Sequence, residues 1–275
     1  MIDLVIKIGS MALIQKQNND IDYNIFSRLS ASLRPGMVLV SSGATEIGRL
    51  DYIKRTGKAL EGDLEHNKTD YAAQGQAILM ELYRRFVPPQ YSVRQVLVEH
   101  NHFNNPLKRK HLYELLMRCA EQNAIPIINY NDAINDEENR KLEIDLWKQS
   151  NPNEWTVECV DNDETAAVVS ELLQVKKMIL LTMTQGIYKD PSDPSTLVEN
   201  VYADNKEALT HKIRALQSHC HGASRQGANG AKAKLEYALR SAMNGVEVTI
   251  ASAKDCTLEE ILSGKAHCTR IGVKE

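Results

Sequence analysis

LVIKIGS, residues 4–10, is an apolar run that carries one lysine and ends in glycine and serine. The run predicts a buried strand, because strands covered on both faces are apolar throughout. An unpaired ammonium group is costly to bury, so Lys7 is expected to reach towards an anion at the strand end. Gly9 would let the backbone approach a phosphate, and the amides around it can form an anion-binding nest. The alternative is a lysine on an edge strand, exposed to solvent.

Strand-like and helix-like segments alternate along the rest of the chain. Apolar runs predict five further strands, over residues 37–40, 93–98, 125–129, 178–182 and 247–251. Amphipathic or helix-length segments predict helices over residues 21–33, 69–87, 106–122, 164–173, 231–244 and 258–262. This alternation predicts an α/β fold, a three-layer αβα sandwich with a mainly parallel central sheet. With no internal repeat or low-complexity linker, residues 1–275 are interpreted as a single domain.

Polar motifs follow three of the predicted strands, at residues 9–10, 41–43 and 129–132, where ligands bind in parallel sheets. SSGA, residues 41–44, offers hydroxyls and free amides to a carboxylate or a phosphate, with a plain N-cap serine as the alternative. NYND, residues 129–132, and DND, residues 161–163, are dense in amides and carboxylates, which suits an α-amino, α-carboxyl substrate. There, Asp132 could pair with a substrate ammonium group. Asx-turn and N-cap roles are the alternative for these two motifs.

A glycine-containing loop, GANGAKAK at residues 227–234, precedes the predicted helix near the C-terminus. Lys234 would stabilise charge on the γ-phosphoryl group and the leaving β-phosphate, and Asp163 could organise the lysines around them. Phosphoryl transfer depends mainly on such positioning and electrostatics. The sequence contains neither a Walker A loop nor a GxGxxG fingerprint after the first strand.

Two long polar stretches interrupt the alternation. Residues 132–159 contain both tryptophans and are interpreted as a hairpin or a lid over the site. Residues 203–230 are polar and contain three glycines.

Composition argues against several classes of protein. The chain is 43% hydrophobic with a formal net charge of -3, and it has no strongly basic block, so nucleic acid is not an expected partner. The five cysteines are scattered and lack CxxC spacing, which argues against a disulfide framework and a zinc site. No apolar run has the 18 or more residues that a membrane helix needs, and no signal peptide is evident. We therefore expect a cytoplasmic protein without a membrane partner.

The order of the motifs resembles the amino acid kinase family. The matching motifs are V-x-K-x-G-S, V-x-V-S-S-G-A, A-A-x-G-Q, P-I-I-N-x-N-D, D-N-D, L-L-T-x-x-x-G-I-Y and G-x-x-G-x-x-x-K-L. The resemblance is closest to the members that phosphorylate the γ-carboxylate of L-glutamate with ATP, the first step of proline biosynthesis. It implies the amino acid kinase fold, a homo-oligomer (dimer or tetramer), and Mg²⁺ bound largely by ATP phosphates and water rather than by protein ligands. Many members carry a C-terminal PUA domain, which we do not expect in this chain.

Residue by residue, the resemblance implies three sets of roles. The catalytic residues would be Lys7, Lys234 and Asp163. The amino acid would be held by Ser42, Gly43, Asp132 and Asn162. The nucleotide would be bound by Lys7, Gly9, Ser10, Thr182, Gly227, Gly230 and Lys234.

Departures from the family pattern motivate two alternatives. Tyr130 stands where the family usually has glutamate, Val160 where it has glycine, and Met183 where it has aspartate. The stretch over residues 133–160 is also longer than usual. The chain could therefore be a kinase of a different small amino acid or carboxylate, or a non-catalytic homologue that binds a nucleotide or an amino acid.

Overall fold

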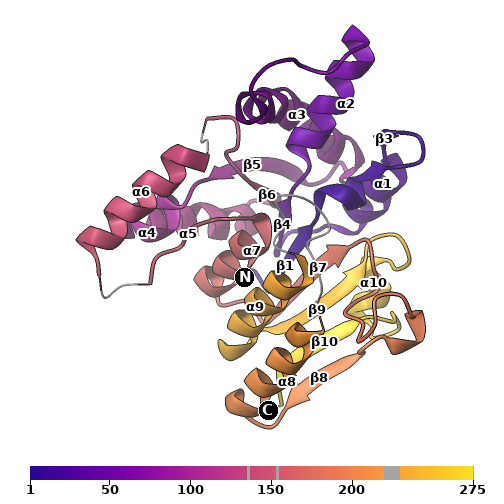
Figure 1. The fold of residues 1–275 in the computed structure, drawn as a ribbon, viewed down its shortest axis with the longest axis vertical. Coiled ribbons are helices and arrows are strands. Elements are labelled where there is room, and N and C mark those ends of the chain that lie inside the picture. Colours follow the sequence, from indigo (N-terminus) through magenta and orange to yellow (C-terminus); the bar gives the residue numbers. More distant parts are fainter. Residues whose placement is uncertain (135–136, 153–154, 220–229, 275) are drawn as a thin grey trace.

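The computed structural model describes residues 1–134, 137–152, 155–219 and 230–274. Among these residues eight strands form one sheet, in the order β5-β6-β4-β1-β7-β9-β10-β8 (Figure 1). The strands are β1 (Leu4–Ile8), β4 (Met37–Ser41), β5 (Ser92–Val98), β6 (Ala124–Tyr130), β7 (Lys177–Thr182), β8 (Asn200–Ala203), β9 (Glu247–Ser252) and β10 (Thr269–Val273). Neighbouring strands are parallel except β9 and β10. The predicted mainly parallel sheet is confirmed.

Helices cover both faces of this sheet. The helices in the described residues are α1 (Tyr23–Ser32), α2 (Ala44–Thr56), α3 (Leu64–Phe86), α4 (Asn101–Asn104), α5 (Pro106–Glu121), α6 (Glu137–Ser150), α7 (Asn162–Leu173), α8 (Lys206–Ser218), α9 (Gly230–Met243) and α10 (Leu258–Leu262). Short elements are the 3₁₀ turns η1 (Ser10–Leu13) and η2 (Pro194–Thr196) and the hairpin strands β2 (Ile14–Gln15) and β3 (Asp20–Ile21). None of the described helices is long and apolar enough to cross a membrane.

The side chains of β1 alternate between two hydrophobic cores, as strand geometry requires. Val5 belongs to a core that includes residues of α5, α7, α8 and α9, while Ile6 and Ile8 belong to a core with α1, α2, α3 and α10. Figure 1 shows α7, α9 and α8 side by side on one face of the sheet. The αβα sandwich is therefore confirmed, whereas the single-domain organisation stays a prediction.

Strand β1 lies inside the sheet and not at its edge. It pairs with β4 on one side and with β7 on the other, in parallel register. The alternative of a solvent-exposed edge lysine is therefore wrong, because Lys7 is only 8% exposed.

Helices α2 and α3 cross at two glycines that allow backbone contact. A Cβ atom on Gly48 would come within 1.8 Å of the carbonyl oxygen of Tyr71, and one on Gly75 within 1.9 Å of that of Ala44. Any larger residue would therefore separate the helices. This contact fixes α3, which carries Gln76 of the A-A-x-G-Q motif, against the start of α2.

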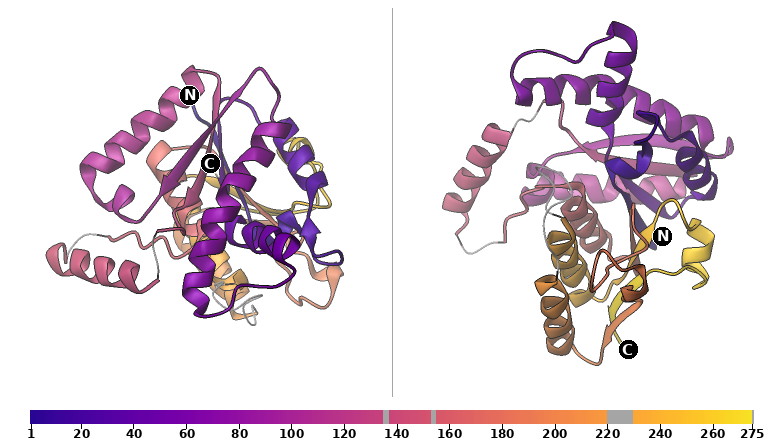
Figure 2. Two further views of the ribbon diagram at one scale, coloured as in Figure 1. Left: turned by 90° about the horizontal axis from the view of Figure 1, so that it is seen from above. Right: turned by 45° about the vertical axis from the view of Figure 1, so that its right-hand side comes forward.

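The polar stretch at residues 132–159 contains a helix, so the hairpin interpretation is wrong. Helix α6 stands clear of the main body in both views of Figure 2 and buries one residue, Ile144. Side-chain contacts tether it: Arg140 donates to the carbonyl oxygen of Cys159 at 3.1 Å, and Nε2 of His100 lies 3.1 Å from a Glu143 carboxylate oxygen. Because α6 buries a single residue, it has no apolar face to pack against the protein. The polar contacts of Arg140 and Glu143 therefore supply much of its attachment.

Candidate active site

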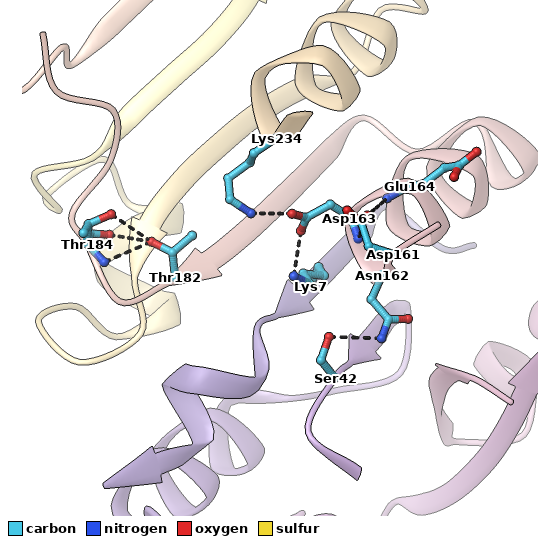
Figure 3. A network of polar contacts seen from close by, with 9 residues as sticks. All are labelled: Lys7, Ser42, Asp161, Asn162, Asp163, Glu164, Thr182, Thr184 and Lys234. Atoms are coloured by element: carbon cyan, nitrogen blue, oxygen red, sulfur yellow. Dashed lines mark hydrogen bonds and ion pairs between the residues drawn. The ribbon is translucent and has the colours of Figure 1, made fainter. Parts of the chain in front are cut away.

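Three charged side chains from three elements meet at the carboxyl end of β1 (Figure 3). Nζ of Lys7 lies 2.7 Å from Oδ1 of Asp163, and Nζ of Lys234 lies 2.5 Å from Oδ2 of the same carboxylate. Lys7 comes from β1, Asp163 from the first turn of α7 and Lys234 from the first turns of α9. The structure thus brings together the three residues that the resemblance identified as catalytic.

The start of α7 is fixed by its own N-cap. The carboxylate of Asp161 accepts hydrogen bonds from the backbone N–H groups of Asp163 and Glu164, each at 2.9 Å. This confirms the N-cap alternative for Asp161. Capping orients the first turn of α7, so that Asp163 faces the two lysines and Asn162 points in a different direction, towards Ser42 (Figure 3).

Lys7, Asp163 and Lys234 form a charged cluster, in which burial and charge shift the pKa values of Lys7 and Asp163. Burial lowers the pKa of Lys7, and the carboxylate of Asp163 partly offsets that effect. Burial raises the pKa of Asp163, but the two ammonium groups outweigh it and hold the pKa of Asp163 well below its usual range. Burial, and then the charge of Asp163, raise the pKa of Asp161. Each ammonium group has three donors, so those not used on Asp163 can serve an anion such as a phosphate.

A chain of uncharged side chains lies beside the charged cluster. Nδ2 of Asn162 donates to Oγ of Ser42 at 3.0 Å and to Oδ1 of Asn129 at 2.9 Å, and Nδ2 of Asn129 donates to Oε1 of Gln76 at 2.8 Å. We call Ser42, Asn162, Asn129 and Gln76 the amide chain. Oδ1 of Asn162 is buried and, among the described residues, accepts no hydrogen bond. Such an unsatisfied acceptor is costly, so a ligand N–H group there would be stabilising.

Two members of the amide chain, Asn129 and Gln76, were not among the individually predicted site residues, although Asn129 belongs to the NYND motif that was expected to suit the substrate. Both stand in motifs that carried the family resemblance, P-I-I-N-x-N-D and A-A-x-G-Q, which is the signal that could have found them. Tyr130 follows Asn129 and packs in the core shared by α5 and α7, on the opposite face of β6. The tyrosine at position 130, where the family usually has glutamate, therefore alters the core and not the amide chain.

The glycines at the strand ends serve different purposes. Gly43 has a φ of 114° and precedes α2, and a Cβ atom there would lie 2.9 Å from Cδ1 of Leu13. Gly43, not a serine, is the N-cap of α2, so the N-cap serine alternative is wrong.

The amide of Gly9 donates to the carbonyl oxygen of Leu181 at 3.2 Å, so this amide does not form part of an anion nest. A Cβ atom on Gly9 would lie 3.7 Å from Nζ of Lys7, an ordinary van der Waals distance, so room for that ammonium group does not require a glycine at this position.

The other predicted residues lie around these two groups. Ser10 begins η1, and Gly230 begins α9 with a φ of 66°. Thr182, at the end of β7, donates through Oγ1 to the carbonyl oxygen of Thr184 at 2.7 Å, which shapes the turn after the strand. Gly227 lies outside the described residues.

Asp132 belongs to neither group. It follows β6, and its carboxyl group makes no hydrogen bond or ion pair with the described part of the chain. Burial raises the pKa of Asp132 to about 6, while Arg140 acts in the opposite direction. A carboxyl group in that state would gain from a cationic ligand.

Comparison with known proteins gives one consistent result. The family described as "Amino acid kinase family" matches residues 4–252. Glutamate 5-kinase of Halalkalibacterium halodurans is 30% identical over 277 residues, which cover 98% of this chain and 67% of that protein. Glutamate 5-kinase of Alkaliphilus metalliredigens is 28% identical over 277 residues, which cover 97% of this chain and 94% of that protein.

Solved structures share the fold at low sequence identity. Carbamate kinase from Giardia lamblia bound to AMP-PNP superposes with a TM-score of 0.61 at 16% identity, covering 99% of this chain and 98% of that one. An isopentenyl phosphate kinase substrate complex gives a TM-score of 0.55 at 13% identity, covering 98% and 100% of the two chains. Because the family match spans residues 4–252 and the curated relatives align with 97–98% of this chain, the chain belongs to the amino acid kinase family.

Proposed function

We propose that the protein is a glutamate 5-kinase, which transfers the γ-phosphoryl group of ATP to the γ-carboxylate of L-glutamate to give L-glutamyl 5-phosphate. The observation that carries the proposal is the convergence of Lys7 and Lys234 on Asp163, directly beside the amide chain. The two lysines suit the phosphates of ATP, and the amide chain suits the polar groups of an amino acid. The names of the curated relatives support the choice of glutamate.

Lys7 and Lys234 would act by neutralising charge on the transferring phosphoryl group and on the leaving phosphate. Asp163 holds both ammonium groups on one carboxylate, so their positions are set before the substrates arrive. Such preorganised charge costs no reorganisation during the reaction. In this proposal Thr182, Gly9, Ser10 and the start of α9 surround the nucleotide.

The acceptor would be bound by Ser42, Asn162 and Asp132. The unpartnered Oδ1 of Asn162 would accept an N–H from the substrate α-ammonium group, and the carboxylate of Asp132 would balance its charge. The γ-carboxylate is ionised near neutral pH, so its attack on the γ-phosphorus needs no general base. Alignment of the two substrates would then supply much of the acceleration.

Mg²⁺ fits this site as a companion of ATP. Both oxygens of Asp163 are taken by ammonium groups, and the described residues contain no cluster of three or more histidine, cysteine or acidic side chains for a metal. The ion would therefore be held chiefly by phosphate oxygens and water, where it would offset phosphate charge. The step in proline biosynthesis, a cytoplasmic location and a homo-oligomeric state stay predictions from the resemblance.

ADP release from Mg-ATP, with and without L-glutamate, tests the proposal. Hydroxylamine in the assay traps an acyl phosphate as the hydroxamate, which identifies the group that was phosphorylated. We expect glutamate-dependent ADP release with a matching amount of hydroxamate. Activity with only another acid, such as aspartate, would replace glutamate by that acceptor, and nucleotide binding without any turnover would leave the non-catalytic alternative.

A further inference from the structure

A cavity of about 490 Å³ lies away from the charged cluster, between helices of one sheet face and α6. Its aromatic lining comes from Phe103 of α4, Trp147 of α6, Tyr237 of α9 and Trp155, which follows α6. The volume lies within the range of about 300–1,000 Å³ that is usual for small-molecule sites. Several rings around one cavity offer a flat, apolar molecule good contacts on both of its faces.

The cavity also has cationic groups. The guanidinium carbon of Arg240 lies 4.5 Å from the centre of the Trp155 ring, and its Nη2 donates to Glu171 at 2.9 Å. Nη1 of Arg240 is buried and has no hydrogen-bond partner among the described residues. A buried N–H group in this state would gain from an acceptor that a ligand supplies.

The carboxylates that line the cavity are neutralised by arginines. Glu171 pairs with Arg240, and Glu236 binds Arg214 through both of its carboxylate oxygens. Arg109 of α5 also lines the cavity, and its side chain makes no ion pair or hydrogen bond within the described ranges. The lining itself has two arginines and two glutamates. With Arg214, which binds Glu236 from outside the lining, the arginines outnumber the carboxylates by one, and this surplus of positive charge favours an anion.

We propose that this cavity is a second ligand site, which binds a small organic anion with a flat body, of the class of aromatic carboxylates. The rings would enclose the body, and Arg109, with Arg240, would bind the carboxylate, for which the planar guanidinium group is well matched. A phosphate without a ring would leave the aromatic walls unused, and a neutral aromatic molecule would leave the surplus charge unpaired.

The second site shares two helices with the charged cluster. Helix α7 carries Asp163 at its start and Glu171 two turns later, while α9 carries Lys234 and, further along, Arg240. These helices pack against each other. A ligand that changes their separation at the cavity would act on the distance between Lys234 and Asp163, so the second site is placed to modulate the transfer site.

Tryptophan fluorescence provides a direct test, because the chain has two tryptophans and both line the cavity. The probe is 3-phenylpropionate, with excitation at the red edge of tryptophan absorption, where the probe does not absorb. We expect a saturable change in emission, and the variants Trp147→Phe and Trp155→Phe should each retain it with a similar Kd. The readout does not depend on turnover, so it can fail or succeed independently of the proposed kinase activity.

Matched ligands and variants test separately the role of the aromatic rings and the role of the arginines. Propionate lacks the ring and 3-phenylpropionamide lacks the charge, so each should bind at least about tenfold more weakly than the probe. Arg109→Gln should weaken binding of the probe about tenfold, whereas Arg118→Gln, an exposed arginine of the same helix outside the cavity lining, should leave it unchanged. The proposal is overturned if the probe gives no saturable change, if the amide binds as tightly as the carboxylate, or if Arg109→Gln binds like the unaltered protein.

Discussion

The charged cluster and the amide chain lie side by side but are built differently. In the charged cluster a carboxylate forms ion pairs with two ammonium groups, and all three side chains are buried or nearly so. In the amide chain the groups are neutral and one acceptor, Oδ1 of Asn162, is left without a partner in the described residues. The charged cluster is held together by its own ion pairs before a ligand binds, with donors left over for an anion, while the amide chain keeps an acceptor open for a ligand N–H group.

This difference separates the reaction from the choice of acceptor. Phosphate charge can be neutralised only by cations, so the charged cluster allows few substitutions. Amides both donate and accept, so the same framework can be adjusted to different acceptors. We therefore expect changes in the charged cluster to lower kcat and changes in the amide chain to raise the KM of the acceptor.

Loss of either lysine should have the largest effect. Lys7→Met and Lys234→Met each remove one cation from the transition state while keeping most of the side-chain volume, and kcat should fall by about 10²–10³-fold or more. ADP release at saturating substrates measures the loss. Lys232→Met is the matched control, because Lys232 is exposed on the same helix, and it should keep normal kcat. Near-normal turnover in the Lys7 or Lys234 variant would remove that lysine from the mechanism.

Replacement of the shared carboxylate should lower both activity and stability. Asp163→Asn leaves two buried ammonium groups without their anion, and we expect the free energy of unfolding to fall by about 3 kcal/mol. Because the lysines hold the pKa of Asp163 below its usual value, its stabilisation is present above about pH 4 and is lost as the pH falls through the folded-state pKa. Urea unfolding at several pH values should show the two proteins converging in acid; equal stability at neutral pH would contradict the ion-pair account.

The pH dependence of acceptor binding should report on Asp132. Its pKa is raised to about 6 in the free protein, and a bound ammonium group would lower it. The KM for glutamate should therefore be lowest above that pH and rise up to about tenfold for each pH unit below it. Initial rates across this range test the expectation. In Asp132→Asn the KM should be high at every pH, without the change near pH 6. If that change survives the substitution, another group causes it.

Most of the predicted strands, such as β1, β4 and β6, were found from sequence because they are buried on both faces, whereas β5 lies at the sheet edge and is partly exposed. Leu4–Ile8 was predicted with its observed bounds, and Met37–Ser41 was predicted one residue short. Strands β8 and β10 were missed because they are short and lie beyond β9 at one side of the sheet. They are recognised by their pairing with neighbouring strands and not by an apolar run in the sequence. Helix α2 was missed because its charged residues weaken the apolar pattern in its sequence. Its close packing against α3, which the sequence does not reveal, stabilises it instead.

The charged cluster was predicted more completely than the amide chain for a physical reason. A lysine inside an apolar strand is conspicuous, because burial of an unpaired charge is so costly that it demands a partner. Gln76 on an amphipathic helix carries no such signal, and its partner Asn129 is 53 residues away in the sequence. Only the packing of α3 beside β6 brings the two amides together.

The smallest expected effect comes from the far end of the amide chain. Gln76→Met removes the acceptor for Asn129, whose own Oδ1 holds Asn162, so Gln76 should act as a positioning residue. We expect the KM for the acceptor to rise about threefold to fivefold, with kcat and the KM for ATP unchanged. Gln76→Glu keeps an acceptor oxygen and should restore most of the affinity. Gln74→Met on the same helix is the control, because Gln74 bonds to Asp51 instead. A fall in kcat with Gln76→Met would mean that the amide chain and the charged cluster act as one unit, and that the reaction and the choice of acceptor are not separable in this fold.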